Sequence, residues 1–533
     1  MSAAHRRPLA DAKGHFQPST PILNPPPEHR GPPQALPAGA GDTAQTVARG
    51  QLDRSLLGGI AWTAGAKWAG QAISWAVTLI VARILTPADF GIVGMATVYL
   101  GLVTLVAEFG LGTAVVTLRD LSSVQLKQIN TLSVAFGLAG ALLSCALAAP
   151  LGRFFHSPRL PLVIIVMSSA FIMMAFQSIP YSLLTRDLRF KLLAGINTAM
   201  VLAQAATALV LALLGWGYWA LVIGSLVGTA VLSVLPIVRA PQGFARPRAA
   251  DLGRVMRFSR HVIVTRAAWY GYSNADFVVA GRVLGEAPLG VYTLAWNLAS
   301  VPLEKITAML TTVTPSFFSA VQTQHAELRR YLLRMSEGLA LVTFPATLGL
   351  ALVAPDFVQL LLGARWMGAV APLELLAIYA SIRSVVTLLP QVLIAVGETR
   401  FMMWVTLLML LALPPVFWLG SRWGAVGIAA GWVLVYPVLT LPLLFRTLRA
   451  IHMRLGEYLR GLWPAASASA VMCVAVLLLK WACPPVWPAY VRLGLEVGTG
   501  AAVYVAVLMG AHRERALTYA RLVIPRRSGP RAA

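Results

Sequence analysis

The fold is decided by stretches such as YWALVIGSLVGTAVLSVLPIV (residues 218–238), a run of apolar and small residues without a charged side chain. A helix of about 20 residues crosses the ~30 Å hydrocarbon core of a bilayer. Comparable stretches follow one another from Ile60 to Met509, joined by short polar connections. They lack the period-2 alternation of membrane β-barrels, so helices are the structure that satisfies their backbone groups in lipid. The sequence therefore predicts an all-α polytopic membrane protein with about 14 transmembrane helices.

The expected spans divide the chain into two sets of six and a final pair. The first set lies near residues 60–85, 90–109, 129–149, 160–183, 192–214 and 218–238, the second near 261–284, 289–314, 339–353, 373–396, 401–419 and 426–444, and the last two near 462–481 and 493–509. This division predicts a disordered, proline-rich cytoplasmic tail (1–50), an N-terminal six-helix lobe (51–240), a basic cytoplasmic connection (241–258), a C-terminal six-helix lobe (259–447), two extra helices (448–511) and a basic cytoplasmic tail (512–533).

Two pairs of short segments indicate that the lobes are repeats. RILTPADFG (83–91) aligns without gaps on RVLGEAPLG (282–290), and GYWALVIG (217–224) aligns on GAVGIAAG (424–431). Because six is an even number of spans, such repeats share an orientation and are related by a pseudo-twofold axis along the membrane normal, as in many transporters. The alternative is that short glycine-containing patterns match by chance.

The formal charge of +23 raises the possibility of a nucleic-acid partner, but its distribution argues against one. Lys and Arg concentrate in alternate connections, such as Arg186, Arg189 and Lys191, or the connection 241–258. Short loops rich in Lys and Arg stay on the cytoplasmic side of a membrane. We therefore expect both termini in the cytoplasm and no nucleic-acid partner.

Signatures of enzymes and of metal sites are missing from the sequence. Cys145, Cys473 and Cys483 lack the spacing of metal ligands, and no lysine follows a phosphate-binding glycine loop. A membrane glycosyltransferase or polymerase would need carboxylates on a sizeable outer loop, whereas the outer connections are short and poor in Asp and Glu. We expect a transporter that is not an enzyme and that uses no cofactor and no metal.

Ionisable and aromatic side chains recur at helical spacing inside the spans. An ionisable residue at the bilayer centre costs about 3 kcal/mol or more, so it is a candidate for function. Guanidinium and ammonium groups in a cavity would bind a phosphate or pyrophosphate, and aromatic rings would contact sugars. The candidates are Lys67, Arg266, Lys305 and Arg383 for the cationic cavity, Trp269, Tyr270, Tyr292 and Trp296 for sugar contacts, and Glu108, Asp276 and Glu304 for coupling carboxylates.

A structural interpretation of the same residues stays open. Lys67 and Lys305 could extend to the membrane interface, and Arg266 and Arg383 could pair with carboxylates to hold helices together. The carboxylates in question are Glu108, Asp276, Glu304 and Glu374. The aromatic residues could pack in the core or form an interfacial belt.

Four segments carry a resemblance to a known family. They are Arg83–Gly91, RDLRFK at 186–191, Gly217–Gly224, and NADFVVAGR at 274–282 running into Leu289–Tyr292. Over most of Leu56–Arg449 the chain resembles the Wzx-type polysaccharide flippases of the multidrug/oligosaccharidyl-lipid/polysaccharide (MOP) exporter superfamily, although the long proline-rich N-terminal tail departs from their pattern.

The resemblance implies a V-shaped pair of bundles in the bacterial inner membrane. It implies alternating-access transport of undecaprenyl-pyrophosphate-linked oligosaccharide for exopolysaccharide, capsule or O-antigen synthesis. Membrane lipid, a polysaccharide polymerase and export machinery would be the partners. The alternatives are a multidrug or lipid II exporter of the same fold and, from another class, a membrane glycosyltransferase or polymerase.

Overall fold

The computed structural model describes residues 73–108, 111–118, 120–248, 252–253, 266–311, 318, 324–483 and 487–515. All of them belong to one compact unit, Thr63–Ala533. The expected tail 1–50 and the first half of the first span, including Lys67, lie outside the described residues. Within the described part, ten helical stretches are long and apolar enough to cross a membrane, and a shorter apolar helix covers Ile73–Ile84. The expected all-α polytopic fold is confirmed.

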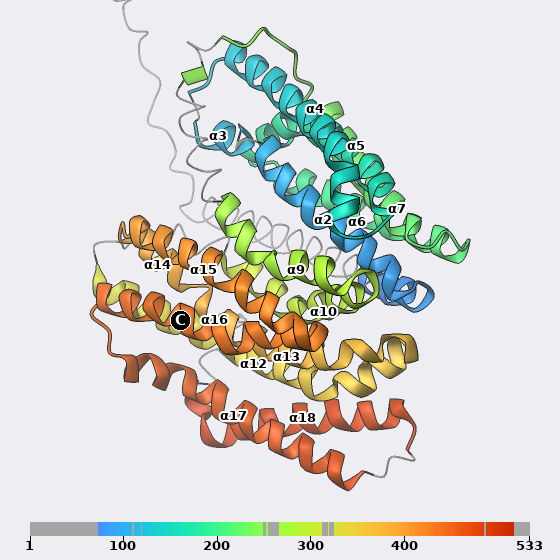
Figure 1. The fold of residues 1–533 in the computed structure, drawn as a ribbon. Coiled ribbons are helices and arrows are strands. Elements are labelled where there is room, and N and C mark those ends of the chain that lie inside the picture. The colour runs from blue at the N-terminus through green and yellow to red at the C-terminus, as the bar shows by residue number, and fades with distance from the viewer. Residues whose placement is uncertain are drawn as a thin grey trace, which may run out of the picture. The chain divides into compact units, whose positions relative to one another are not determined.

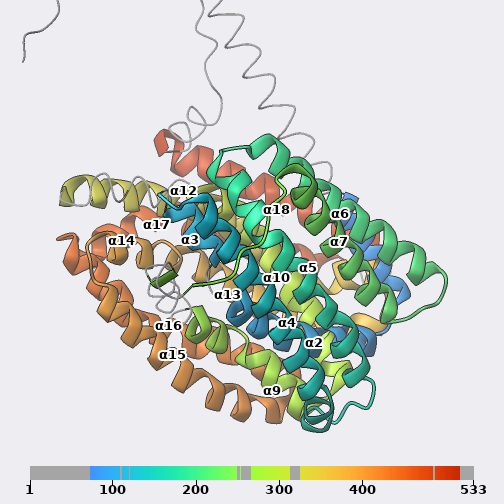
Figure 2. The ribbon, with the colours of Figure 1, turned by 90° about the horizontal axis from the view of Figure 1, so that it is seen from above.

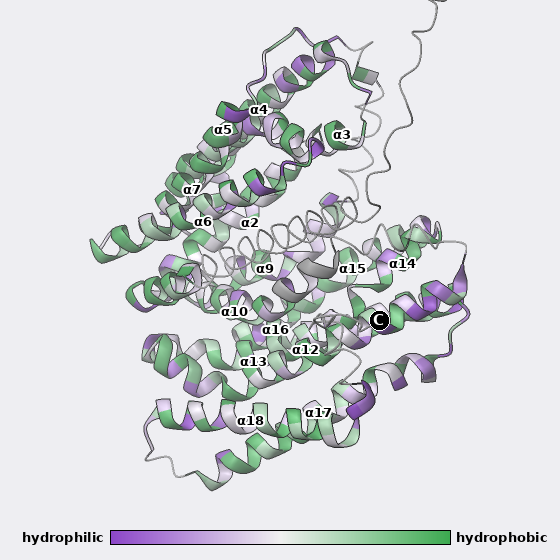
Figure 3. Cartoon of the chain, turned by 180° about the vertical axis from the view of Figure 1, so that it is seen from behind, coloured by the Kyte–Doolittle hydropathy of each residue, from purple (hydrophilic) through white to green (hydrophobic). Residues whose placement is uncertain are grey.

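The helices follow the expected spans closely. The first half of the chain forms α2 (Pro87–Glu108), α3 (Leu111–Thr117), α4 (Ser123–Phe154), α5 (Leu160–Arg186), α6 (Phe190–Leu213) and α7 (Trp219–Arg239). The second half forms α9 (Ala275–Leu284), α10 (Glu286–Thr311), α12 (His325–Leu361), α13 (Val370–Val386), α14 (Leu389–Ala395), α15 (Thr399–Gly420) and α16 (Gly424–Ala450), with short 3-10 helices at Ala364–Ala369 and Ser421–Trp423. The final pair is α17 (Leu455–Ala482) and α18 (Ala489–Ala511). Apolar residues run along these helices, and hydrophilic residues gather toward several of their ends (Figure 3).

Three helices depart from the expected spans. Helix α12 begins at His325, well before the expected 339–353. Its first turns are rich in charged residues, so the apolar run alone does not show where the helix starts. The span expected at 373–396 is divided into α13 and α14, and Pro390, which has no backbone N–H, lies at the start of α14. The span expected at 261–284 is helical at 266–273, turns at Asn274 and continues as α9.

Helices α2 and α10 pack through their backbones. A Cβ atom placed on Gly91 would lie 1.8 Å from the carbonyl oxygen of Glu286, and one placed on Gly290 would lie 1.7 Å from that of Pro87. Only glycine permits so close an approach of two helices. In the alignment of 83–91 on 282–290, Gly91 corresponds to Gly290 and Pro87 to Glu286. The two contacts are therefore reciprocal, which supports the proposed repeat.

Polar contacts fix the turns on either side of this packing. The backbone N–H of Tyr218 donates to Asp89 Oδ1 at 3.0 Å, and Ser157 Oγ donates to Glu286 Oε1 at 2.6 Å. Trp366 Nε1 donates to the carbonyl oxygen of Ala82 at 2.7 Å. The first contact ties the turn at Asp89 to the start of α7 within the first half, and the other two connect the first half to the second.

The remaining helices surround this junction. Helix α2 also packs on α4 and α5, and α13 packs on α10, α12 and α16. Helices α6 and α7 run side by side in both views (Figures 1 and 2). Helices α17 and α18 pack on each other and on α12 (Figure 1).

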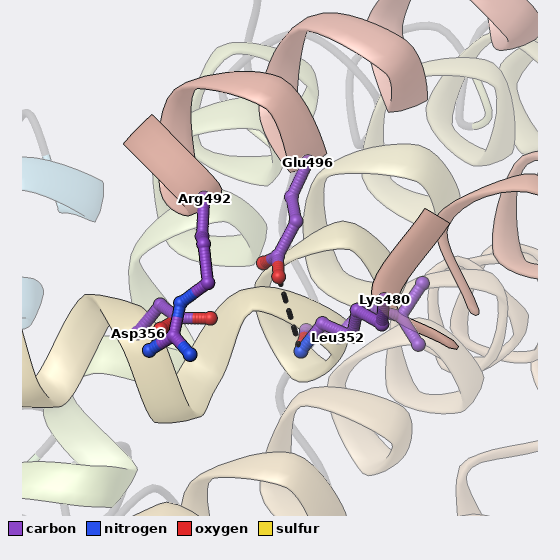
Figure 4. A network of polar contacts seen from close by, with 5 residues as sticks. All are labelled: Leu352, Asp356, Lys480, Arg492 and Glu496. Atoms are coloured by element: carbon purple, nitrogen blue, oxygen red, sulfur yellow. Dashed lines mark hydrogen bonds and ion pairs between the residues drawn. The ribbon is translucent and has the colours of Figure 1, made fainter. Parts of the chain in front are cut away.

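An ion-pair network ties the last two helices to α12. Arg492 Nη2 lies 2.5 Å from Asp356 Oδ1, Lys480 Nζ lies 3.6 Å from Glu496 Oε1, and Lys480 also donates to the carbonyl oxygen of Leu352 (Figure 4). Glu496 is almost fully buried. Buried charges are costly unless they are paired, so this network holds α17 and α18 in place.

Candidate functional site

A cavity of about 270 Å³ lies among the helices of the second half. The segment 266–273 before α9, α10, α13, α14, α15 and α16 all contribute to its lining. Its polar and aromatic lining comprises Trp269, Tyr272, Ser273, Trp296, Tyr379, Arg383, Thr387, Thr406, Trp432 and Tyr436. We call this space the Arg383 cavity.

Aromatic rings form one continuous wall of the Arg383 cavity. The ring centroid of Tyr379 lies 5.9 Å from that of Trp296, 4.9 Å from that of Trp432 and 5.1 Å from that of Tyr436. Such rings present apolar faces with polar tips, which suits the faces and hydroxyl groups of a sugar. Because the rings come from α10, α13 and α16, three helices together determine the shape of the wall.

Arg383 supplies the positive charge of the cavity. It lies one helical turn after Tyr379 on α13, so the guanidinium and the ring share one face of that helix. It forms no ion pair or hydrogen bond with any of the residues that the structure describes. A guanidinium that no described carboxylate contacts directly, in a largely apolar cavity, favours binding of an anion, and its planar fork suits phosphate oxygens.

A buried hydrogen-bond network lies directly behind the aromatic wall. Asp276 Oδ2 accepts hydrogen bonds from Tyr292 Oη at 2.6 Å and from Trp432 Nε1 at 2.9 Å. Asp276 and Tyr292 are fully buried. The carboxylate therefore positions the Trp432 ring that faces the cavity without itself lining the cavity.

The structure brings only some of the sequence candidates together. Trp269, Trp296 and Arg383 line the cavity, whereas Asp276 and Tyr292 lie behind its wall. The hydroxyl of Tyr270 donates to the carbonyl oxygen of Val98 on α2, at 2.8 Å. The remaining candidates lie elsewhere: Arg266 and Glu304 are exposed, Lys67 falls outside the described residues, and so do the side chains of Lys305 and Glu108.

Glu304 attracts the Arg383 guanidinium electrostatically, as the structural interpretation expects. Among the described residues, no direct ion pair joins Arg266 or Arg383 to Asp276, Glu304 or Glu374. Asp276 Oδ2 instead accepts from two neutral donors, whereas Oδ1 is buried without a hydrogen-bond partner among the described residues.

The sequence analysis missed the contribution of α16. Trp432, Tyr436 and Thr440 are spaced by four residues and therefore share one face of this helix. That spacing alone predicts an aromatic face on this helix. The candidates were chosen by the charged residues of a span, and the span from 426 to 444 contains none.

Comparison with known proteins places these features in context. A sequence model of the family described as "Polysaccharide biosynthesis protein" matches residues 80–371. The chain is 26% identical over 420 residues to the lipopolysaccharide biosynthesis protein WzxC of Escherichia coli (strain K12), which covers 75% of this chain and 83% of WzxC. It is 26% identical over 492 residues to the succinoglycan biosynthesis transport protein ExoT of Rhizobium meliloti (strain 1021), which covers 89% of this chain and 96% of ExoT.

Solved structures of transporters share the fold. An inward closed conformation of the lipid II flippase MurJ superposes with a TM-score of 0.68 at 13% identity, over 85% of this chain and 99% of MurJ. An inward-facing multidrug resistance MATE transporter of the MOP superfamily superposes with a TM-score of 0.58 at 16% identity, over 71% of this chain and 95% of the transporter. At these identities the likeness concerns the fold alone, and it confirms that this chain has the all-α fold of these transporters.

Proposed function

This chain belongs to the polysaccharide biosynthesis protein family, and on that premise we propose that it is a flippase for lipid-linked oligosaccharide. It would move undecaprenyl-pyrophosphate-linked oligosaccharide across the bacterial inner membrane by alternating access, for exopolysaccharide, capsule or O-antigen synthesis. Its similarity to proteins named for lipopolysaccharide biosynthesis and for succinoglycan transport supports this substrate class. The fold shared with a lipid II flippase supports the mechanism.

The observation that carries the proposal is the Arg383 cavity. In our proposal the guanidinium binds the pyrophosphate, because an anion is the ligand that a cation attracts when no described carboxylate contacts it directly. The neighbouring rings of Trp296, Tyr379 and Trp432 receive the first sugar. The polyprenyl chain stays in the lipid, where its burial costs nothing.

Asp276 is the coupling carboxylate in this proposal. It lies in the same helical bundle as the cavity and holds Trp432 by a hydrogen bond. A proton taken up at Asp276 would change that hydrogen bond and with it the aromatic wall. Glu304 and Glu108 remain candidates for the same role.

A second candidate function is multidrug export, which the MATE-like fold and the aromatic wall favour. Aromatic rings bind organic cations through their faces. Arg383 would repel such cations, and this repulsion is why we favour the anionic substrate.

Deletion of the gene in its own host separates these functions. We expect undecaprenyl-linked oligosaccharide to accumulate in the inner leaflet, where a glycosidase added outside spheroplasts cannot reach it, and surface polysaccharide to be lost. Re-expression of the wild-type protein should restore both. Normal surface polysaccharide together with increased sensitivity to cationic drugs would instead identify a drug exporter. A block in peptidoglycan synthesis would identify lipid II as the substrate.

A further inference from the structure

A second polar cavity lies among the helices of the first half, apart from the Arg383 cavity. This open cavity of about 430 Å³ is lined by residues of α3, α5 and α7, and small-molecule sites typically measure ~300–1,000 Å³. No charged side chain of the described residues lines it. Its polar lining consists of Thr113 on α3 and of Gln177, Ser178, Tyr181, Ser182 and Thr185 on α5. We call it the Gln177 cavity.

Gln177 is a buried polar residue of the cavity lining. It is only 8% exposed, and its Oε1 atom has no hydrogen-bond partner among the described residues. A buried polar group without a partner is costly. Because the Oε1 atom is itself buried, it would accept a hydrogen bond from a molecule in the cavity after the side chain turned toward that space.

The neighbouring hydroxyl groups offer both donors and acceptors. Ser182 and Thr185 donate to backbone carbonyl oxygens one turn earlier, at 2.7 Å and 3.0 Å, so their oxygens remain available as acceptors. The hydroxyl of Tyr181 accepts from Asn197 Nδ2 at 3.2 Å, so its own proton remains available for donation. Mixed donors and acceptors match sugar hydroxyls, each of which donates one hydrogen bond and accepts others.

Its described lining residues carry no charge, which distinguishes this site from the Arg383 cavity. A phosphate would require cations or several convergent N–H donors, and a polyprenyl chain would require an apolar lining. The hydroxyl and amide groups on one face of α5 suit a sugar, whose apolar ring faces would pack against Val116, Met174 and Leu232 in the same lining.

We propose that the Gln177 cavity binds an uncharged sugar unit of the oligosaccharide, and this inference rests on the proposed flippase function. The substrate would then be held at two subsites, one in each half of the chain. Arg383 would hold the pyrophosphate, and Gln177 and Tyr181 would hold a sugar farther along the glycan. A glycan that contacts both halves at once would favour the arrangement of the helices in which both subsites can be filled.

The direct test uses free oligosaccharide, released by mild acid from the lipid-linked oligosaccharide that accumulates in the deletion host. Its binding to the purified full-length protein in lipid nanodiscs is measured by saturation-transfer NMR and titration calorimetry. We expect wild-type protein to bind it, and Gln177→Leu and Tyr181→Phe each to weaken binding by about 2- to 10-fold, the loss of one neutral hydrogen bond. Ser469→Ala is the matched control, because it removes a fully buried hydroxyl without a described partner on α17, far along the chain.

The inference is overturned if free oligosaccharide does not bind the wild-type protein, or if both variants bind it as the wild type does. It is also overturned if, in native mass spectrometry, the variants change the amount of phospholipid bound to the protein but not the amount of oligosaccharide. Intact lipid-linked oligosaccharide distinguishes this failure from failure of the proposed function. If the intact substrate binds and Arg383→Ala weakens that binding while the Gln177 and Tyr181 variants behave normally, only the sugar subsite is wrong. If the intact substrate does not bind the wild-type protein at all, the flippase proposal itself fails.

Discussion

Arg383 is the residue on which capture of the pyrophosphate depends. We expect Arg383→Ala to weaken binding of lipid-linked oligosaccharide by about 10- to 150-fold, the equivalent of about 1.5–3 kcal/mol for a charge-assisted contact. Arg383→Lys should recover part of the loss, because it keeps the charge but not the planar fork. Export of surface polysaccharide, normalised to membrane abundance of the protein, is the measurement.

The matched control for Arg383 is Arg422→Ala. Arg422 is an arginine that lies over the ring of Trp418 and does not line the cavity. Its export should equal that of the wild type. Normal export by Arg383→Ala would eliminate the proposed pyrophosphate site, and a collapse of protein abundance would indicate a structural role instead.

Asp276 is the residue on which coupling depends. Asp276→Asn keeps an oxygen that can accept from Tyr292 and Trp432 but can no longer gain or lose a proton. We therefore expect folded protein whose transport no longer depends on the proton gradient. Transport into inverted vesicles, with and without an imposed pH difference, measures this dependence, and Glu304→Gln and Glu108→Gln complete the series. Unchanged dependence in all three variants would remove the carboxylates as coupling sites.

At the scale of the element, the contact between α2 and α10 predicts a symmetric effect of two mutations. Gly91→Ala and Gly290→Ala each place a methyl group against a backbone carbonyl. Each should therefore lower the free energy of unfolding by about 1–3 kcal/mol. Gly195→Ala is the control, because nothing lies within 4 Å of a Cβ atom there. Thermal unfolding in detergent is the measurement. An effect at one glycine without the other would argue against the repeat.

The docking of α17 and α18 predicts a second effect on stability. Asp356→Ala removes the carboxylate that neutralises Arg492, and the two side chains are 9% and 23% exposed. Breaking such a pair costs about 3–5 kcal/mol, so α18 should detach at lower temperature, as limited proteolysis would detect. The exposed pair of Arg330 with Glu327 is the comparison, because Glu327→Ala should cost at most about 0.5 kcal/mol. Equal proteolysis of the two variants would show that the network does not hold the helix.

Sequence reasoning predicted the helices better than it predicted the site, and the reason is physical. Length and apolarity fix a membrane span, because the bilayer imposes both. The lining of a cavity depends on which helices pack together, and a single span does not encode this. Arg383 was found because a charge in an apolar run is costly. Trp432 was missed because an aromatic residue in an uncharged span packs equally well in a core, and Tyr270 contacts α2 although it shares the spacing of the cavity residues.

At the scale of the whole molecule, the distribution of Lys and Arg predicts that both termini are cytoplasmic. Reporter fusions at Gly50 and Ala533 test this orientation: an alkaline phosphatase fused at either position should be inactive, and a cytoplasmic fluorescent protein should be bright. A fusion in the periplasmic connection expected near 153–159 is the control and should give the opposite pattern. An active phosphatase at either terminus would invert the orientation, and Arg383 would then face the opposite leaflet.

The reciprocal glycine packing between α2 and α10 also bears on how the protein responds to its ionic surroundings. At Gly91 and Gly290 the close approach joins backbone atoms, and dispersion between such atoms carries no net charge for dissolved ions to screen. The Arg492 and Asp356 pair, by contrast, weakens as counter-ions reach its exposed portion. The α2–α10 junction should therefore hold equally well at low and at high ionic strength, whereas the attachment of α18 through this pair should weaken as salt is added.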